Sequence, residues 1–404
     1  MDSNAWRLCS FGCQSAELCN SLASLAKRLC TEFIDPPVLQ AFVACRLIPL
    51  NKCPGLRPIG IGETFRRIIS KSIAAVVKDD ICQCAGSLQV CAGQEGGSEA
   101  AIHAMRSIFH ADESDCVLLV DAKNAFNTLN RNATLHNSRL ICPALSTILI
   151  NTYRVAITMY VIGGEIIQSV EGTTQGDPLA MAMHAIGTVP LISSLAGICK
   201  QVWFADDATG AGTINEVWKW WDKLTEVEGD FGYQTNATKS WLIVKPEAKK
   251  QAEVVFANSG VRITTTGKRH LGAALGDDCL VEEYIRGKVD EWAKQVLNLT
   301  LIAKTQPHAA YSAFTHGLIG RWNFLLRTVK EISHLLAPLE KVVRQQFITA
   351  LTGQTAISDE MRSLLALPCR LGGLNIIDPT QMADWHYQTS ERITAPLAAE
   401  IVNQ

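Results

Sequence analysis

The stretch Val202-Trp-Phe-Ala-Asp-Asp207 decides the fold, because it joins a short apolar run to two adjacent carboxylates. A continuous apolar run bounded by polar residues is typical of a buried strand. The residues that follow, Ala208-Thr-Gly-Ala-Gly212, are small and turn-prone, so we expect the chain to reverse direction there. The pattern predicts a hairpin that carries Asp206 and Asp207 at its tip.

A second apolar run, Cys116-Val-Leu-Leu-Val120, ends in the same way at Asp121, which predicts another buried strand with a carboxylate at its end. Between the two runs, Gly172-Thr-Thr-Gln-Gly-Asp-Pro178 leads into a long apolar stretch. We expect Asp177 to be the N-cap of a helix and Pro178 its first residue. The start of that helix would then face an anion.

The rest of the chain alternates strand and helix patterns and then becomes helical. Residues 217–227 fit a helix that Gly232 ends, and residues 241–244 fit a short apolar strand, so we expect a mixed α+β domain. A helix from Pro338 to Gly353 and an amphipathic helix before it predict a helical bundle. The amphipathic positions are Ile285, Val289, Trp292, Val296 and Leu299. Near the N-terminus, leucines at helical spacing predict a helix that Pro36 and Pro37 close.

The composition constrains the partners and the compartment. The formal net charge is −2 and the pI is about 6.5, so the chain lacks the global positive potential of many nucleic-acid-binding proteins. One short stretch is basic, and it either tracks phosphates or forms a solvated helix face. Its residues are Arg57, Arg66, Arg67, Lys71 and Lys78.

The 14 cysteines do not form a small disulfide scaffold, and no cleavable signal sequence is evident. We therefore expect an intracellular protein that is not secreted, in the nucleus or the cytoplasm. The longest apolar run, Pro178 to Ile198, contains His184 and Pro190, so we expect a buried core helix and no membrane association.

The carboxylates at the two strand ends suit a divalent cation. Magnesium keeps water and substrate oxygens in its octahedral shell, so one or two protein carboxylates per ion are enough. Asp121 with Asp206 meets that demand, and the repulsion between Asp206 and Asp207 would raise a carboxyl pKa unless a cation is present. Taken alone, Asp206-Asp207 fits a solvated turn better, so the order of the surrounding motifs decides.

These motifs, in this order, resemble those of reverse transcriptases. Each motif is weak alone, but the ordered set ends near Gly276 and is specific. They are a fingers motif of the group II intron and non-LTR retrotransposon type, Lys52-Cys-Pro-Gly-Leu-Arg-Pro-Ile-Gly-Ile61; the first palm motif, Asp121-Ala-Lys-Asn-Ala-Phe126; the second, Gly172–Pro178; the third, Phe204–Asp207; the fourth-motif lysine, Lys239; and the primer-grip turn, Leu271-Gly272. The segment Leu367–Leu374 is similar to the one that follows the polymerase in many non-LTR elements.

The resemblance implies an α+β right-hand polymerase, with fingers, a mixed α/β palm whose antiparallel sheet is backed by helices, and a helical thumb. It implies an RNA-directed DNA polymerase that uses two Mg²⁺ ions, or Mn²⁺, with an RNA template, a DNA or RNA primer and deoxynucleoside triphosphates. The expected divisions are an N-terminal helical segment 1–40, fingers 41–115, palm 116–276 with a fingers insertion at about 130–170, thumb 277–375 and a C-terminal tail 376–404.

The resemblance also implies residue roles, each with a plainer alternative. Asp121, Asp206 and Asp207 would hold the metal ions, and Lys52 and Arg57 the incoming triphosphate. Phe126 would collide with a ribose 2′-hydroxyl, or else is a core phenylalanine.

In the second palm motif, Gln175 would bond the incoming nucleotide while Gly176 allows close backbone approach, or else the two belong to a simple turn that opens a helix. Lys239 would protonate or neutralise the leaving pyrophosphate, or else is a surface lysine. Asn127 replaces an aspartate that the family often has, which removes one acid from the rim of the site.

Two other functions stay open. A catalytically inactive or domesticated copy that binds RNA would fit the acidic balance and the missing companion domains. An RNA-dependent RNA polymerase shares the metal chemistry, but Phe126 and the Phe-Ala pair before Asp206 disfavour it, since the viral RNA enzymes usually have glycine there.

Overall fold

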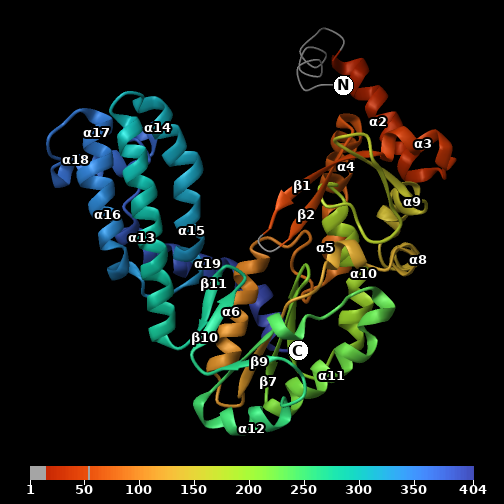
Figure 1. The fold of residues 1–404 in the computed structure, drawn as a ribbon. Coiled ribbons are helices and arrows are strands. Elements are labelled where there is room, and N and C mark those ends of the chain that lie inside the picture. The colour runs from red at the N-terminus through yellow and green to blue at the C-terminus, as the bar shows by residue number, and fades with distance from the viewer. Residues whose placement is uncertain (1–14, 53–54) are drawn as a thin grey trace.

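A central sheet carries one lobe of mixed structure and one lobe of helices on its two sides (Figure 1). This computed structural model describes residues 15–52 and 55–404. The α+β class predicted from the sequence is confirmed. We use the terms fingers, palm and thumb for the mixed lobe, the central sheet with its helices, and the helical lobe.

The palm sheet has five strands in the order β6-β7-β3-β8-β9. The central strand β3 pairs antiparallel with β7 and β8, and β9 pairs parallel with β8. The strands are β3 (Cys116–Val120), β6 (Lys200–Phe204), β7 (Asp207–Gly212), β8 (Trp241–Val244) and β9 (Arg262–Thr264). The three strands predicted from apolar runs are therefore present.

The expected turn after Asp207 was wrong. The chain reverses at Ala205 and Asp206, and residues 208–212 form most of β7. Small residues suit this strand because it packs closely: a Cβ on Gly210 would lie 2.9 Å from the Trp220 ring. The small residues of β7 therefore reflect the close packing of α11 (Ile214–Phe231) on this strand.

Helices cover both faces of the palm sheet. Side chains alternate along β3, so Leu118 and Val120 join the core formed with α10 (Ala180–Ser194) and α11, which α12 (Lys249–Val255) extends. Val117 and Leu119 join the opposite core, which contains α6 (Gly97–His110) and α19 (Pro379–Val402). The helix predicted at 217–227 is part of α11, and Gly232 caps it in the left-handed conformation, with φ 71°.

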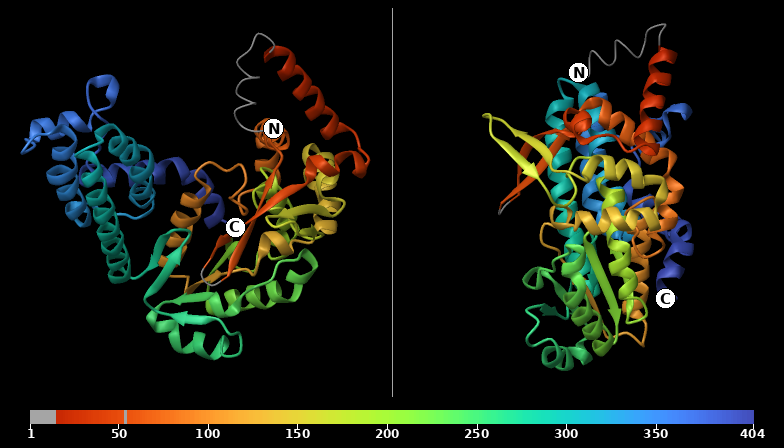
Figure 2. Two further views of the ribbon diagram at one scale, coloured as in Figure 1. Left: turned by 45° about the horizontal axis from the view of Figure 1, so that its top comes forward. Right: turned by 90° about the vertical axis from the view of Figure 1, so that its right-hand side faces the viewer.

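The fingers contain a second sheet, with strand order β2-β1-β4-β5, and its β4–β5 hairpin projects from the body of the molecule (Figure 2). Its strands are β1 (Cys45–Asn51), β2 (Leu56–Gly62), β4 (Ile157–Val161) and β5 (Ile166–Ser169). The helices of the fingers are α2 (Ser15–Thr31), α3 (Pro36–Val43), α4 (Thr64–Val76), α5 (Lys78–Ala85), α8 (Arg131–Ile141) and α9 (Pro143–Tyr153), and the short helix α7 (Ala125–Thr128) follows β3 of the palm. The N-terminal helix was predicted correctly over α2, but the two prolines open α3. Residues 1–14 of the predicted segment lie outside the described residues.

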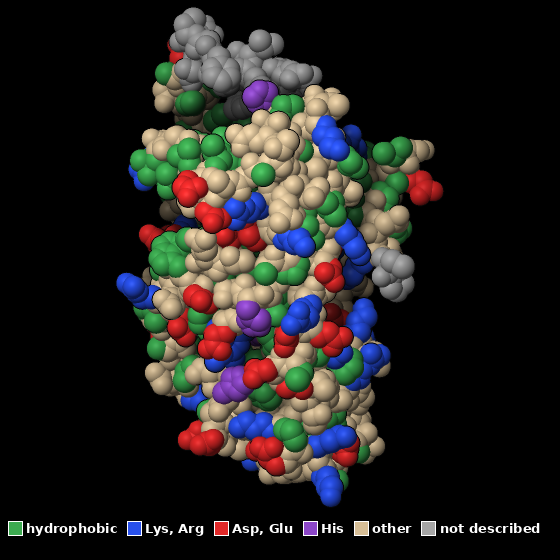
Figure 3. All heavy atoms as spheres, turned by 90° about the vertical axis from the view of Figure 1, so that its left-hand side faces the viewer, with side chains coloured by type: hydrophobic (Ala, Val, Ile, Leu, Met, Phe, Trp, Pro, Cys, Tyr) green, Lys and Arg blue, Asp and Glu red, His purple; other side chains and the backbone are tan. Residues whose placement is uncertain are grey.

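The thumb follows the β10–β11 hairpin and has its own apolar core, around Trp292, Phe314, Trp322 and Phe347. The hairpin strands are β10 (Gly267–His270) and β11 (Ala273–Gly276). The thumb helices are α13 (Asp278–Ala303), α14 (Pro307–Ala313), α15 (Ile319–Thr328), α16 (Ala337–Val342), α17 (Thr349–Thr352) and α18 (Asp359–Ala366). The predicted amphipathic helix is α13, and the helix predicted from Pro338 is α16 continued through a π-turn into α17. The face of the molecule on which the thumb lies carries interspersed acidic and basic side chains (Figure 3).

The predicted domain boundaries stay predictions, but two helices link lobes across them. Helix α6, expected within the fingers, packs under the palm sheet, and α19, expected as a tail, is a long helix that packs on α6 and α15. Beyond α19, the Gln404 side chain donates a hydrogen bond to the Gln201 carbonyl oxygen of β6, at 2.7 Å.

The helix that follows the second palm motif, α10, starts at Ala180 and not at Pro178, but Asp177 still caps the turn before it, because its Oδ1 accepts a hydrogen bond from the Leu179 nitrogen at 3.0 Å. The Asp177 carboxylate accepts hydrogen bonds from the Tyr153 hydroxyl, at 2.6 Å, and from Arg66 of α4, and the side chains of this ion pair are 1% and 3% exposed. Arg66 therefore holds the motif in place and does not track phosphates. None of the described helices is long and apolar enough to cross a membrane.

We predict that Arg66→Met lowers the free energy of unfolding by about 3–5 kcal/mol, because it leaves the Asp177 charge buried without its partner. Urea unfolding followed by circular dichroism measures this change. The neighbouring Arg67 is exposed, so Arg67→Met is the matched control and should change stability little. Equal stability of the two variants would contradict this role of the buried pair.

Candidate active site

The turn that carries Asp206 is held in an unusual backbone conformation. Ala205 has φ 56°, a left-handed value that costs a residue with a Cβ about 1–2 kcal/mol. The Gln89 side chain is fully buried and bonds both the Ala205 nitrogen, at 2.9 Å, and the Ala205 carbonyl oxygen, at 3.1 Å. The Tyr233 hydroxyl donates to the Asp206 carbonyl oxygen at 2.8 Å. Two side chains from other elements thus fix the turn.

Strand pairing brings Asp121 close to this turn. Leu119 of β3 lies opposite Thr209 of β7, so Asp121 and Asp207, each two residues away, lie on the same face near the same end of the sheet. Asp121 is held through its backbone, whose nitrogen donates to the Ser240 hydroxyl at 3.2 Å. The predicted neighbourhood of the three aspartates is therefore present.

The electrostatic surroundings of Asp206 and Asp207 differ. Burial, and then the Asp121 charge, raise the pKa of Asp206, while Lys52 and Arg57 of the fingers hairpin oppose the rise. Burial, followed by the charges of Asp206 and Asp121, raises the pKa of Asp207 to about 6, against the opposing effect of Arg269 on β10. The Asp206 carboxylate therefore interacts electrostatically with the basic side chains of the fingers hairpin. The Asp207 carboxylate interacts with Arg269, on the hairpin that precedes the thumb.

The three carboxylates are suitable donors for a hard divalent cation, but they do not form a closed ligand cage. Over residues 15–52 and 55–404, no group of three or more His, Cys, Asp and Glu side chains is arranged to hold a metal ion. Carboxylates whose pKa values rise through mutual repulsion gain most from an added cation. Magnesium also takes ligands from water and substrate phosphates, so an open arrangement fits it.

Phe126 lies on α7 and stacks on a buried imidazole. Its ring centre lies 4.4 Å from that of His184 on α10, with 25° between the ring planes, and His184 is fully buried. Burial lowers the pKa of His184 to about 4, so the ring is neutral at physiological pH. The Phe126 carbonyl oxygen accepts from the Thr173 nitrogen at 2.6 Å, and a Cβ on Gly172 would lie 2.4 Å from that oxygen. The first two palm motifs are therefore in direct contact.

The second palm motif also contacts the fingers. The Gln175 carbonyl oxygen accepts from the Gly60 nitrogen of β2 at 2.8 Å, and Gly176, with φ 108°, could not carry a Cβ because Gly60 oxygen would lie 2.6 Å from it. The close approach predicted for Gly176 therefore involves strand β2. Lys52 and Arg57 are exposed at the tip of the β1–β2 hairpin, and residues 53–54 of this motif lie outside the described residues.

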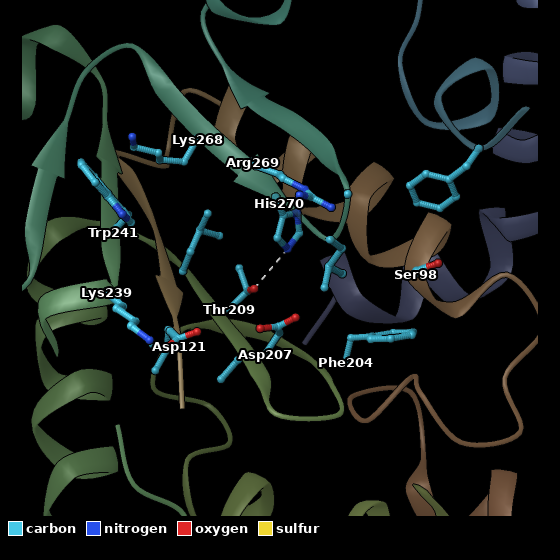
Figure 4. A pocket seen from close by; sticks show the side chains of 16 residues that line it. Ser98, Asp121, Phe204, Asp207, Thr209, Lys239, Trp241, Lys268, Arg269 and His270 are labelled. Atoms are coloured by element: carbon cyan, nitrogen blue, oxygen red, sulfur yellow. Dashed lines mark hydrogen bonds between the residues drawn. The ribbon is translucent and has the colours of Figure 1, made fainter. Parts of the chain in front are cut away.

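A cavity of about 710 Å³ opens beside the carboxylates (Figure 4). Asp121, Asp207 and Lys239 line it, so the structure brings the fourth-motif lysine to the aspartates. Sequence analysis missed several other lining residues. They are Trp241, Lys268, Arg269, His270 and Phe324.

The missed residues come from three separate elements, so no local pattern marked them. His270 is buried beneath the cavity, where its Nε2 lies 3.2 Å from the Thr209 hydroxyl, and burial lowers its pKa to about 4. Phe324 projects from α15 of the thumb toward Gly272, the glycine of the predicted primer-grip turn. Trp241 follows Lys239 by two residues, but Lys239 ends a 3-10 turn before β8 begins at Trp241, so strand alternation could not have placed the two side chains together.

Comparison with solved structures finds similarity to telomerases. Apo telomerase from Candida tropicalis superimposes with a TM-score of 0.50 at 11% identity, over 98% of this chain and 72% of the telomerase chain. Telomerase from Candida albicans, in complex with a TWJ fragment of telomeric RNA, gives a TM-score of 0.49 at 9% identity, over 95% and 65%. The fold is therefore similar to that of telomerase. No family model and no curated protein sequence matches the chain.

The raised pKa of Asp207 predicts a pH-dependent stability. Its folded-state pKa is about 6 against an ordinary value of 3.8, so the wild type loses stability as pH rises between these values and the side chain must ionise. When a chelator removes divalent cations, Asp207→Asn should be more stable than the wild type above pH 6. This difference in stability should fade toward pH 4. Thermal unfolding across this pH range measures it.

The exposed Asp222 of α11 provides the control, and Asp222→Asn should show no such pH-dependent gain. If the stability difference between Asp207→Asn and the wild type did not change with pH, the pKa of Asp207 would not be raised by burial and by the two neighbouring carboxylates.

Proposed function

We propose that this protein is an RNA-directed DNA polymerase that adds deoxynucleotides to a primer. The carrying observation is the pairing of β3 with β7, which places Asp121 and Asp207 on one face beside the cavity, with Asp206 in the adjoining turn. The polymerase fold and the ordered motifs support this proposal. A retroelement origin of the non-LTR or group II intron type is part of it and rests on the motifs.

In the proposed reaction, the primer 3′-oxygen forms a bond with the α-phosphorus of a deoxynucleoside triphosphate, and the bond from that phosphorus to the bridging oxygen breaks. Pyrophosphate leaves. Asp121 and Asp206, with Asp207 in support, would hold two Mg²⁺ or Mn²⁺ ions, which neutralise charge on the attacking and leaving oxygens.

The protein side chains would bind the phosphates, orient the incoming nucleotide and exclude a ribose 2′-hydroxyl. Lys52 and Arg57 face the carboxylates from the fingers and suit the triphosphate, and Lys239 suits the leaving pyrophosphate, to which it can donate a proton. Phe126 is braced by His184, so its ring has little freedom to move away from a ribose 2′-hydroxyl. Gln175 lies between β2 and the start of α10, where its half-buried side chain can reach the incoming nucleotide.

The partners follow from this reaction. They are an RNA template, a DNA or RNA primer and deoxynucleoside triphosphates.

The second candidate function is an inactive reverse-transcriptase-like protein that binds RNA. The acidic balance of the chain, with a formal net charge of −2, motivates it. RNA binding that survives the loss of Asp121 and Asp206, without any synthesis by the wild type, would establish it.

Primer extension on an RNA template tests the first candidate. We expect the wild type to incorporate deoxynucleotides with Mg²⁺, and Asp206→Asn to lower the rate by at least about 100-fold, which corresponds to a few kcal/mol of lost charge stabilisation. Asp222→Asn removes an acid from the exposed face of α11 and should retain the wild-type rate. The proposal fails if the wild type and Asp206→Asn are equally inactive across templates and metals.

Sugar selectivity tests the role of Phe126. Phe126→Ala should lower the preference for dNTP over NTP by about 10-fold or more, because the steric contact with the 2′-hydroxyl is lost. The measured quantity is the ratio of kcat/KM for the two nucleotides. Phe126→Tyr keeps the ring and should keep the preference. An unchanged ratio in Phe126→Ala would instead make Phe126 a core residue.

A further inference from the structure

An aromatic and basic cluster beside the carboxylates has no role in the reaction described above. Lys268 Nζ lies 3.7 Å from the centre of the Trp241 ring, and the Arg262 guanidinium carbon lies 5.4 Å from it. Among residues 15–52 and 55–404, neither basic side chain forms an ion pair with a carboxylate. Two positive charges are thus held at an indole ring without being neutralised.

Strand register fixes where this cluster lies relative to the carboxylates. Trp241 of β8 is opposite both Leu119 of β3 and Arg262 of β9, so the three side chains form one row across the sheet. Asp121 follows Leu119 by two residues on the same face, and such a step is about 6.6 Å along a strand. Trp241 is therefore on the strand next to that of Asp121 and on the same face, and Arg262 lies one strand farther out.

The third member reaches this row from another element. Lys268 belongs to β10, which packs beside β8, and Figure 4 shows its amine above the Trp241 ring at one end of the cavity, with Asp121 and Asp207 farther in. The next residue, Arg269, already acts on Asp207, whose pKa it lowers. Within the described part of the chain, Lys268 and Arg262 form no ion pair with a carboxylate, so both charges remain for a ligand.

The ring prepares the two cations for an anion. A cation held over an indole face keeps its charge, because the attraction comes from the ring quadrupole and no proton is transferred. Holding the long side chains in place beforehand reduces the conformational entropy that binding would cost. Strands of one sheet hold Trp241 and Arg262, so their separation is set before a ligand arrives.

We propose that Trp241, Arg262 and Lys268 form a subsite for a nucleotide phosphate next to the reacting centre. The proposal deepens the proposed function and takes the class of ligand from it. Two sources present the same chemistry, a phosphodiester of the primer strand and the triphosphate of the incoming nucleotide. Because the row is displaced from Asp121 along the strand, the phosphate held there is a neighbour of the reacting one.

Binding of a labelled primer–template hybrid, followed by fluorescence anisotropy at several salt concentrations, tests the primer source. Each lost phosphate contact should lower the slope of log affinity against log salt by about 0.9. Because the two side chains share one phosphate, we expect the slope of the Arg262→Gln, Lys268→Gln double variant to fall by about 0.9. Trp241→Ala should weaken binding about 2- to 5-fold, and Trp241→Phe, which keeps a ring, should not.

A matched control removes two exposed lysines elsewhere, Lys219 on α11 and Lys304 after α13, as Lys219→Gln, Lys304→Gln. Calorimetric titration with dGTP tests the other source: a loss of dGTP affinity in the cluster variant with an unchanged hybrid slope assigns the subsite to the triphosphate. The proposal is overturned if the cluster and control variants have equal slopes and equal dGTP affinities.

These measurements do not depend on catalysis. A wild type that binds through the cluster but incorporates no nucleotide would refute the polymerase function and leave the subsite standing. A wild type that extends primers, with no effect of the cluster variant on binding, would refute the subsite alone.

Discussion

The antiparallel pairing of β3 with β7 is the constraint on which the site depends. Side chains alternate along both strands, so a register shift of one residue would turn Asp121 or Asp207 toward the opposite face, into the core under α10 and α11. Buried apolar residues on both faces oppose such a shift, since each face of β3 packs into its own core. The position of the carboxylates is therefore fixed by burial that involves no catalytic group.

Contacts between motifs provide a second constraint. The Arg66–Asp177 pair joins fingers helix α4 to the second palm motif, and the Gly60–Gln175 bond joins strand β2 to it. Gly176 allows the close approach to β2, and Gly172 allows a close approach to the backbone of Phe126 and Asn127, because a Cβ at either position would collide with that backbone. The motifs contribute to the site by holding one another as well as by presenting side chains.

Much of the palm could be predicted from local sequence patterns. The strands ending at Asp121 and Asp206 have continuous apolar runs, and α11 and α13 have helical periodicity, because burial alone determines these patterns. The turn position could not be predicted, since Ala205 has no intrinsic preference for positive φ and depends on Gln89, more than one hundred residues earlier.

Dependence on residues that are distant in the sequence also explains why some site residues were missed and why the start of the helix was misplaced. Asp177 has the sequence signature of an N-cap, and its Oδ1 does bond the Leu179 nitrogen, but no local pattern shows that Tyr153 and Arg66 bind its Oδ2. Trp241, Arg262 and Lys268 meet through sheet register and a separate hairpin, which the sequence does not reveal without strand order.

The central claim is that Asp121 and the Asp206–Asp207 turn together bind divalent cations at the cavity. The most direct measurement is Mn²⁺ binding by electron paramagnetic resonance, with the hybrid and a non-hydrolysable dNTP analogue present. The account predicts bound Mn²⁺ in the wild type and its loss in Asp121→Asn, with Asp222→Asn unaffected. Equal Mn²⁺ binding by wild type and Asp121→Asn would contradict it.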